Sequence, residues 1–166
     1  MTPYDADGIQ RRIFSKRLLN GSVDDMAVDG SVTNQTFEIA PPVDQIWRIS
    51  QWAIFIQDEK GFDITSYGNG SALTNGMLIQ GTFGGVTSDL LPFPIKSTAD
   101  IISVTYEMDL KTFGNNDDVL VARWRFTDCG QFVRLDGSQG DKLQVVIRDD
   151  MTFLDKQIIT AQGYIE

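Results

Sequence analysis

Acidic residues are the groups in this sequence whose type and spacing could most readily do chemistry. The run Asp25–Gly30 resembles the start of an EF-hand loop, but Ala27 stands where a ligand belongs and Thr36 where the bidentate glutamate should be. The match fails, so we expect turn acids surrounded by solvent, and no metal or other cofactor. That expectation covers three acidic pairs: Asp24-Asp25, Asp117-Asp118 and Asp149-Asp150.

Other groups that could support catalysis are few. The chain has no histidine, which removes Ser-His-Asp and Cys-His catalysis and histidine-ligated metals. Cys129 lies in a predicted turn with no histidine to accept its proton, so we interpret it as inert or structural. Glu107 could be one of the two carboxylates that a glycoside hydrolase needs, and a hydrolase using Glu107 stays open as an alternative. We predict that the protein is not an enzyme.

Three tryptophans could form a platform on which sugars stack. Trp124 is in phase with the apolar face of its predicted strand, which favours a place in the core, whereas the position of Trp47 stays open. A carbohydrate-binding module acting at a host surface is therefore an alternative function. It predicts that Trp47 is exposed.

The elements that would position these residues are mostly strands. Apolar and polar residues alternate over several segments separated by Gly, Asn and Asp clusters, which is typical of half-buried strands joined by turns. We predict an all-β fold, an antiparallel β-sandwich of jelly-roll type, with a closed barrel as the alternative. The run Gly81–Gly85 is expected to be a flexible loop. The expected strands are Ser31–Ile39, Gln45–Gln57, Met77–Gln80, Ile101–Asp109, Val119–Phe126, Lys142–Arg148 and Gln157–Ile165.

The long run Gln45–Gln57 carries apolar residues at both odd and even positions. It fits a strand buried on both faces, or one with a bulge half-way along. No helical pattern stands out beyond the N-terminal region.

The N-terminal region differs from the rest, so we divide the chain into an arm and linker at residues 1–30 and a sandwich domain at residues 31–166. Apolar residues in Gly8–Leu19 lie near helical spacing, and the arm is expected to be extended or a short helix. It either orders against a partner or packs along its own domain. The candidate partner-binding residues are Arg11, Arg12, Ile13, Phe14, Lys16 and Arg17.

Charge is distributed unevenly along the chain. The net charge is −9, yet residues 1–20 hold four bases against two acids. An acidic chain repels phosphate groups, so neither nucleic acid nor an anionic membrane is an expected partner. The single cysteine and the lack of a signal-peptide pattern favour a protein that folds in the cytosol.

Two stretches carry a resemblance to a known class of proteins. One is Gly61–Gln80, which follows the strand entry IAPPVDQIWRI, and the other is Val119–Gly140, which leads into KLQVVIRDD. Together they resemble small virion structural proteins of tailed bacteriophages, of the β-sandwich head-decoration or cement type. The resemblance implies a homotrimer in the virion, assembled in the host cytoplasm, that binds the major capsid protein or other virion proteins.

A tail, collar or fibre-adaptor protein of the same particle is the alternative. If the arm is the anchor, deleting residues 1–20 is expected to abolish particle binding without unfolding residues 31–166.

Overall fold

The structure is a computed structural model of the whole chain. It describes residues 12–59, 62–68, 70–104, 107–113, 117–126 and 132–166, and for residues 107–113 and 117 the description is of the backbone. No helix in these ranges is long and apolar enough to cross a bilayer.

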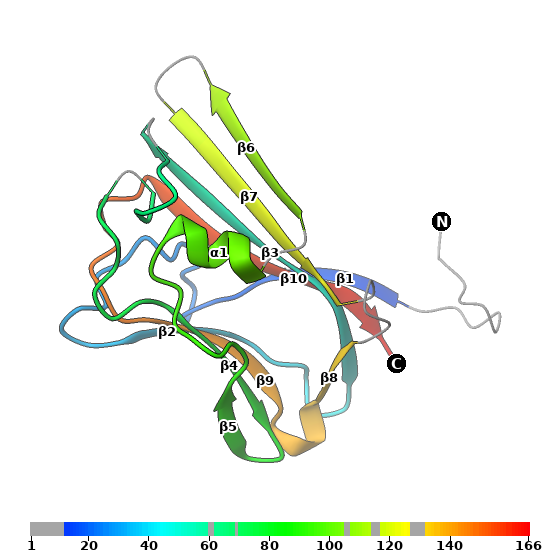
Figure 1. Cartoon of the computed structure of the whole chain (residues 1–166). Coiled ribbons are helices and arrows are strands. Elements are labelled where there is room, and N and C mark those ends of the chain that lie inside the picture. The colour runs from blue at the N-terminus through cyan, green and yellow to red at the C-terminus, as the bar shows by residue number, and fades with distance from the viewer. Residues whose placement is uncertain (1–11, 60–61, 69, 105–106, 114–116, 127–131) are drawn as a thin grey trace.

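Two antiparallel sheets pack face to face (Figure 1), which confirms the predicted all-β sandwich. The larger sheet has the order β1 (Arg12–Arg17), β10 (Lys156–Ile165), β3 (Ile46–Glu59), β7 (Asp117–Arg125), β6 (Glu107–Phe113), and β8 (Val133–Asp136) pairs with the part of β3 that β7 leaves free. The smaller sheet has the order β2 (Gln35–Ile39), β9 (Lys142–Ile147), β4 (Leu78–Phe83), β5 (Val86–Asp89).

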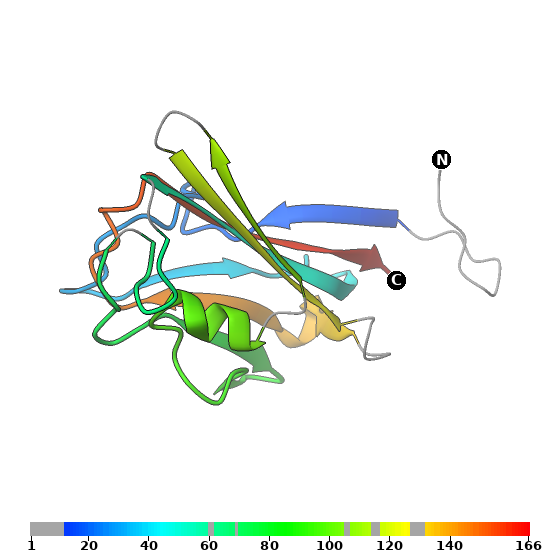
Figure 2. The same ribbon diagram turned by 45° about the horizontal axis from the view of Figure 1, so that its top comes forward.

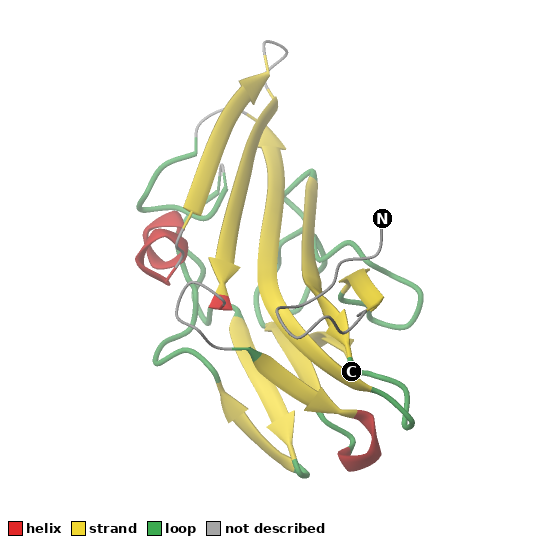
Figure 3. Cartoon of the chain, turned by 90° about the vertical axis from the view of Figure 1, so that its right-hand side faces the viewer, coloured by secondary structure: helices red, strands yellow, loops and turns green. Residues whose placement is uncertain are grey.

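Strand β3 organises the core because it lies in the middle of the larger sheet (Figure 3). Its buried apolar side chains change parity along the strand, from Ile49 to Trp52. On the neighbouring strand, Gly163 pairs with Ile49 and Gln162 with Gln51, so Ser50 is an extra residue in the ladder. The mixed apolar pattern therefore reflects a β-bulge, which was one of its two sequence interpretations.

The predicted strand Ile101–Asp109 is wrong at its start. A short helix, α1 (Thr98–Val104), comes first, and β6 begins only at Glu107. The reason is a capping box: the Ser97 N–H donates to the Asp100 carboxylate at 2.9 Å, and the Asp100 N–H donates to the Ser97 hydroxyl at 3.3 Å. This local signal outweighs the alternation of polar and apolar residues that follows it.

Two short strands, β5 and β8, were not predicted from the sequence. The run Gly81–Gly85 is a tight hairpin rather than a flexible loop, since β4 continues to Phe83 and pairs with β5. Gly84 and Gly85 make the turn at φ 56° and 82°, a conformation that favours glycine and suits a two-residue hairpin.

The N-terminal arm is extended over Arg12–Arg17, not helical. It forms β1, which pairs along its whole length with β10 (Figure 2), and Leu18 and Met26 beyond it are fully buried. Leu19 then forms a bridge with Glu38 of β2 in the other sheet. From Arg12 onward the segment thus packs along its own domain, while Arg11 lies outside the described residues.

Candidate interaction surface beside the edge strand

Most acids near the turns hold loops in place. Four of them accept hydrogen bonds from both the backbone N–H and the hydroxyl of the residue two positions later, which fixes a tight turn. These Asp-x-Ser/Thr pairs are Asp29 with Ser31, Asp63 with Thr65, Asp136 with Ser138, and Asp150 with Thr152.

These hydrogen bonds act on the carboxyl groups themselves. The backbone N–H of Thr65, followed by its hydroxyl, lowers the pKa of Asp63. The Thr152 hydroxyl is the largest cause of the lowered pKa of Asp150. Carboxyl groups held ionised by local donors serve the loop and are poorly suited to general acid catalysis.

Asp149 corrects the expectation of solvent-exposed acids. It is buried, and its carboxylate accepts backbone N–H groups from Thr74, Asn75 and Gly76, the last at 2.7 Å. Asp118 is buried as well. Asp149 thereby connects the loop before β4 to the loop after β9, so its carboxylate has a structural role.

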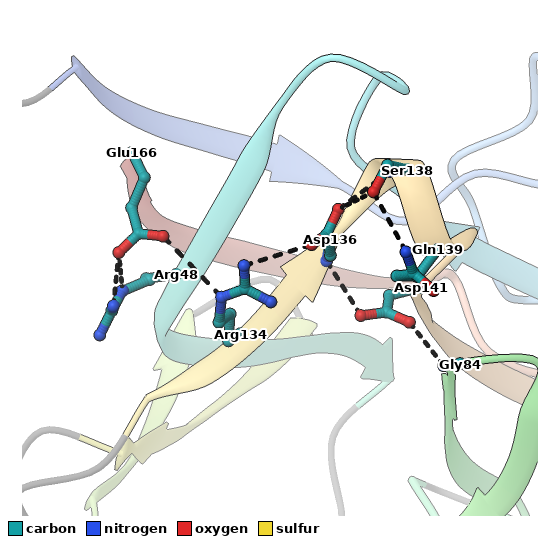
Figure 4. A network of polar contacts seen from close by, with 8 residues as sticks. All are labelled: Arg48, Gly84, Arg134, Asp136, Ser138, Gln139, Asp141 and Glu166. Carbon is teal, nitrogen blue, oxygen red and sulfur yellow. Dashed lines mark hydrogen bonds and ion pairs between the residues drawn. The ribbon is translucent and has the colours of Figure 1, made fainter.

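A chain of polar contacts fastens the end of the sandwich where the C-terminus lies (Figure 4). Glu166 forms ion pairs with Arg48 and Arg134, and Arg134 also contacts Asp136. Asp141 accepts the N–H of Asp136 at 3.0 Å and, from the other sheet, the N–H of Gly84 at 2.8 Å. The second sheet is thus held to the first by a nearly buried carboxylate.

Within the described ranges, no group of three or more His, Cys, Asp or Glu residues could hold a metal ion. Cys129 and the side chain of Glu107 fall outside the description. All three tryptophans are buried, with Trp47 6% exposed. The sugar-stacking hypothesis required an exposed Trp47, so the structure contradicts its premise.

The hollow surface that involves the predicted arm residues is a groove beside β1. It runs between β1 and the segment Glu38–Pro42 that ends β2, and two adjoining hollows of 390 and 470 Å³ make it up. The rings of Phe14 and Trp47 lie on its floor with centroids 4.4 Å apart. Gln45 holds the Trp47 indole by accepting its N–H at 2.8 Å. The groove therefore has a rigid aromatic floor.

The candidate residues take different places around this groove. Phe14 faces the inside of the sandwich and is 7% exposed. Arg12 and Lys16 lie two positions to either side of it in the strand, so their side chains emerge on the same face and line the groove. Ile13 points to the outer face of the sheet and is 66% exposed.

Arg17 is engaged elsewhere. Its guanidinium forms an ion pair with Asp24, and this hydrogen bond is the largest cause of the lowered pKa of Asp24. Among the described residues, Arg12 and Lys16 have no such acidic partner. The groove therefore carries two cations that are unpaired within the described residues, on a chain whose net charge is −9.

Residues of other segments that form the wall and floor of the groove were not predicted from the sequence: Trp47, Gln45 and Pro42. The sequence did not decide whether Trp47 lies in the core or at the surface. In the structure it lies under the groove, at the margin of the core. The Pro41-Pro42 pair that follows β2 was a sequence signal for this wall, since prolines at a strand end leave an edge that cannot be extended.

Comparisons with protein-family models, with curated proteins and with solved structures found no match to this chain.

Proposed function

We propose that this chain is a non-enzymatic structural protein of a tailed-bacteriophage virion, a capsid decoration or cement protein that stabilises the head by protein–protein contacts. The observation that carries the proposal is the cationic groove beside β1, on a sandwich whose turn acids are occupied by backbone donors. A β-sandwich with an open edge strand that carries cations is suited to docking on a larger assembly. The phage context comes from the sequence resemblance.

The physical requirements of a cement protein support this proposal. A cement protein works by binding at many symmetric positions, where weak contacts add up through avidity. A homotrimer would follow the closed symmetry that most oligomers have. Loops fixed by Asp149, Asp141 and the four Asp-x-Ser/Thr turns limit the entropy lost on docking.

Copy number in the particle tests the proposal. Gradient-purified virions would be analysed by quantitative peptide mass spectrometry, with the major capsid protein as internal reference. Cement predicts a copy number comparable to that of the capsid protein. A few copies per particle would overturn the decoration role in favour of a tail or collar position, and absence from virions would overturn the virion proposal.

A further inference from the structure

The outer edge of β1 has hydrogen-bonding groups that the sandwich does not use. The Leu18 N–H donates to Ile159 of β10 at 3.0 Å, and the Leu19 N–H, next along the chain, donates in the opposite direction to Glu38 at 3.1 Å. Backbone groups alternate sides along a strand. Residues 13, 15 and 17 therefore direct their N–H and C=O groups away from β10, and within the described ranges no strand pairs with them.

Within the described residues, the opposite wall of the groove makes no backbone hydrogen bond to residues 12–17 of β1. Beyond Ile39 it consists of Ala40, Pro41 and Pro42, and proline has no N–H to donate. The two sheets approach each other at the Leu19–Glu38 bridge. Between this bridge and Arg12, the groove runs along the side of the sandwich. The outward N–H and C=O groups of β1 lie along it without a strand partner among the described residues.

The groove-facing side chains of β1 specify what could fill it. In order they are a cation, an aromatic ring and a cation: Arg12, Phe14 and Lys16. A strand added beside β1 places its own alternate side chains opposite these three. Acidic, apolar and acidic residues at alternate positions would complement them in charge and in polarity.

We propose that the groove binds an extended segment of a partner protein by strand addition to β1, and that this segment carries acid-x-apolar-x-acid. The inference rests on the proposed function in that another protein is the ligand. It adds the chemistry of that ligand and the backbone edge that receives it. The added strand would cover the aromatic floor formed by Phe14 and Trp47.

The direct test uses the full chain, labelled with ¹⁵N, and the end-blocked peptide TETVTET as probe. Saturable chemical-shift changes are expected at the amides of Ile13, Ser15 and Arg17. The charge-reversed peptide TKTVTKT is the matched probe and should bind at least tenfold more weakly. Equal binding of both peptides, or no saturable change up to millimolar TETVTET, would overturn the proposal.

Two variants separate the ladder from the charges. Ser15→Pro removes an N–H that points away from β10, a position where an edge strand tolerates proline, and it should abolish binding without lowering the urea midpoint. Arg12→Gln/Lys16→Gln should weaken binding at least tenfold and leave the ladder intact. Ser15→Thr is the matched control and should bind as the native chain does. Unchanged affinity in both test variants would overturn the proposal.

Three further outcomes distinguish the site from the proposed function. A dimer in sedimentation that Ser15→Pro dissolves would give the groove to a second copy of this chain and overturn the acidic partner. If virions lack the chain but TETVTET binds as expected, the virion function fails and the strand-addition site stands. If Ser15→Pro decorates virions as the native chain does, the site fails and the function stands.

Discussion

At the scale of single residues, several acids of the described part of this protein hold the backbone in place. Asp149 gathers three N–H groups in a buried position, and an ionised acceptor makes stronger hydrogen bonds than a neutral one. Asp63 and Asp150, in exposed turns, each accept one backbone N–H and one hydroxyl. A loop held in this way needs neither a metal nor a disulfide to keep its shape.

The lowered pKa values of Asp63 and Asp150 predict how stability depends on pH. Their carboxyl groups bind protons less readily in the folded chain than in the unfolded chain. Their stabilising contribution is therefore complete above the unfolded pKa of about 4 and is lost as pH falls below it through the folded pKa. We expect the urea concentration at the unfolding midpoint to decrease when the pH is lowered from about 5 to about 2.5. In the double variant Asp63→Asn/Asp150→Asn this decrease should be smaller.

Asparagine is the suitable replacement because its side-chain oxygen can still accept the turn hydrogen bonds without titrating. Asp155→Asn, which removes an exposed carboxyl group outside these turns, is the control and should leave the slope as it is. An identical pH slope in the double variant and in the native chain would contradict the assignment of acid sensitivity to these turns.

At the scale of elements, the bulge between β3 and β10 shapes the edge of the sandwich. Gly163 sits at this bulge and pairs with Phe14 of β1 on its other side. A Cβ atom added at Gly163 would lie 1.9 Å from the carbonyl oxygen of Arg48. That oxygen belongs to the backbone of the central strand and cannot rotate away, so the strands would have to separate.

Gly163→Ala is therefore expected to lower the free energy of unfolding by about 2–3 kcal/mol, as overpacked sites do. The measurement is urea unfolding followed by tryptophan fluorescence. Gln162→Ala changes the exposed neighbour at the same bulge and should stay within about 0.5 kcal/mol of the native chain. If both variants unfold at the native midpoint, the close approach at Gly163 is not a constraint on the sheet.

Periodicity identified the elements whose local signals agree with it. In β7 and β9 the apolar face alternates without interruption, and the structure has strands there with nearly the expected bounds. Where a short local motif competes, alternation failed: the Ser97–Asp100 capping box starts a helix ahead of β6. β5 is exposed along its whole length and shows no apolar face from which a strand could be predicted.

The groove shows the limit of sequence reasoning for the candidate surface. The basic residues of the arm were identifiable because bases cluster there on an acidic chain. Their pairing with β10 was not, since strand partners far apart in sequence leave no local signal. The floor residue Trp47 comes from β3, and only the fold brings it beneath Phe14.

At the scale of the whole molecule, the N-terminal strand belongs to the sandwich. Phe14 and Leu18 contribute to its core, and without β1 the strand β10 would lose one of its two neighbours. Deleting residues 1–20 to test the arm as an anchor would thus remove part of the domain along with the binding surface. The sequence predicted that this deletion leaves residues 31–166 folded, and from these contacts we now expect it to destabilise them.

We expect the deletion of residues 1–20 to lower the free energy of unfolding by at least about 4 kcal/mol, because two large buried side chains leave the core. That is a large share of the roughly 5–15 kcal/mol by which domains are stable. Urea unfolding, followed by circular dichroism and tryptophan fluorescence together, measures it. The matched control is a deletion of residues 1–11, which retains β1 and should keep the native midpoint. A chain shortened by twenty residues that unfolds at the native midpoint would mean that β1 is a removable arm, and loss of particle binding in it would then report on docking alone.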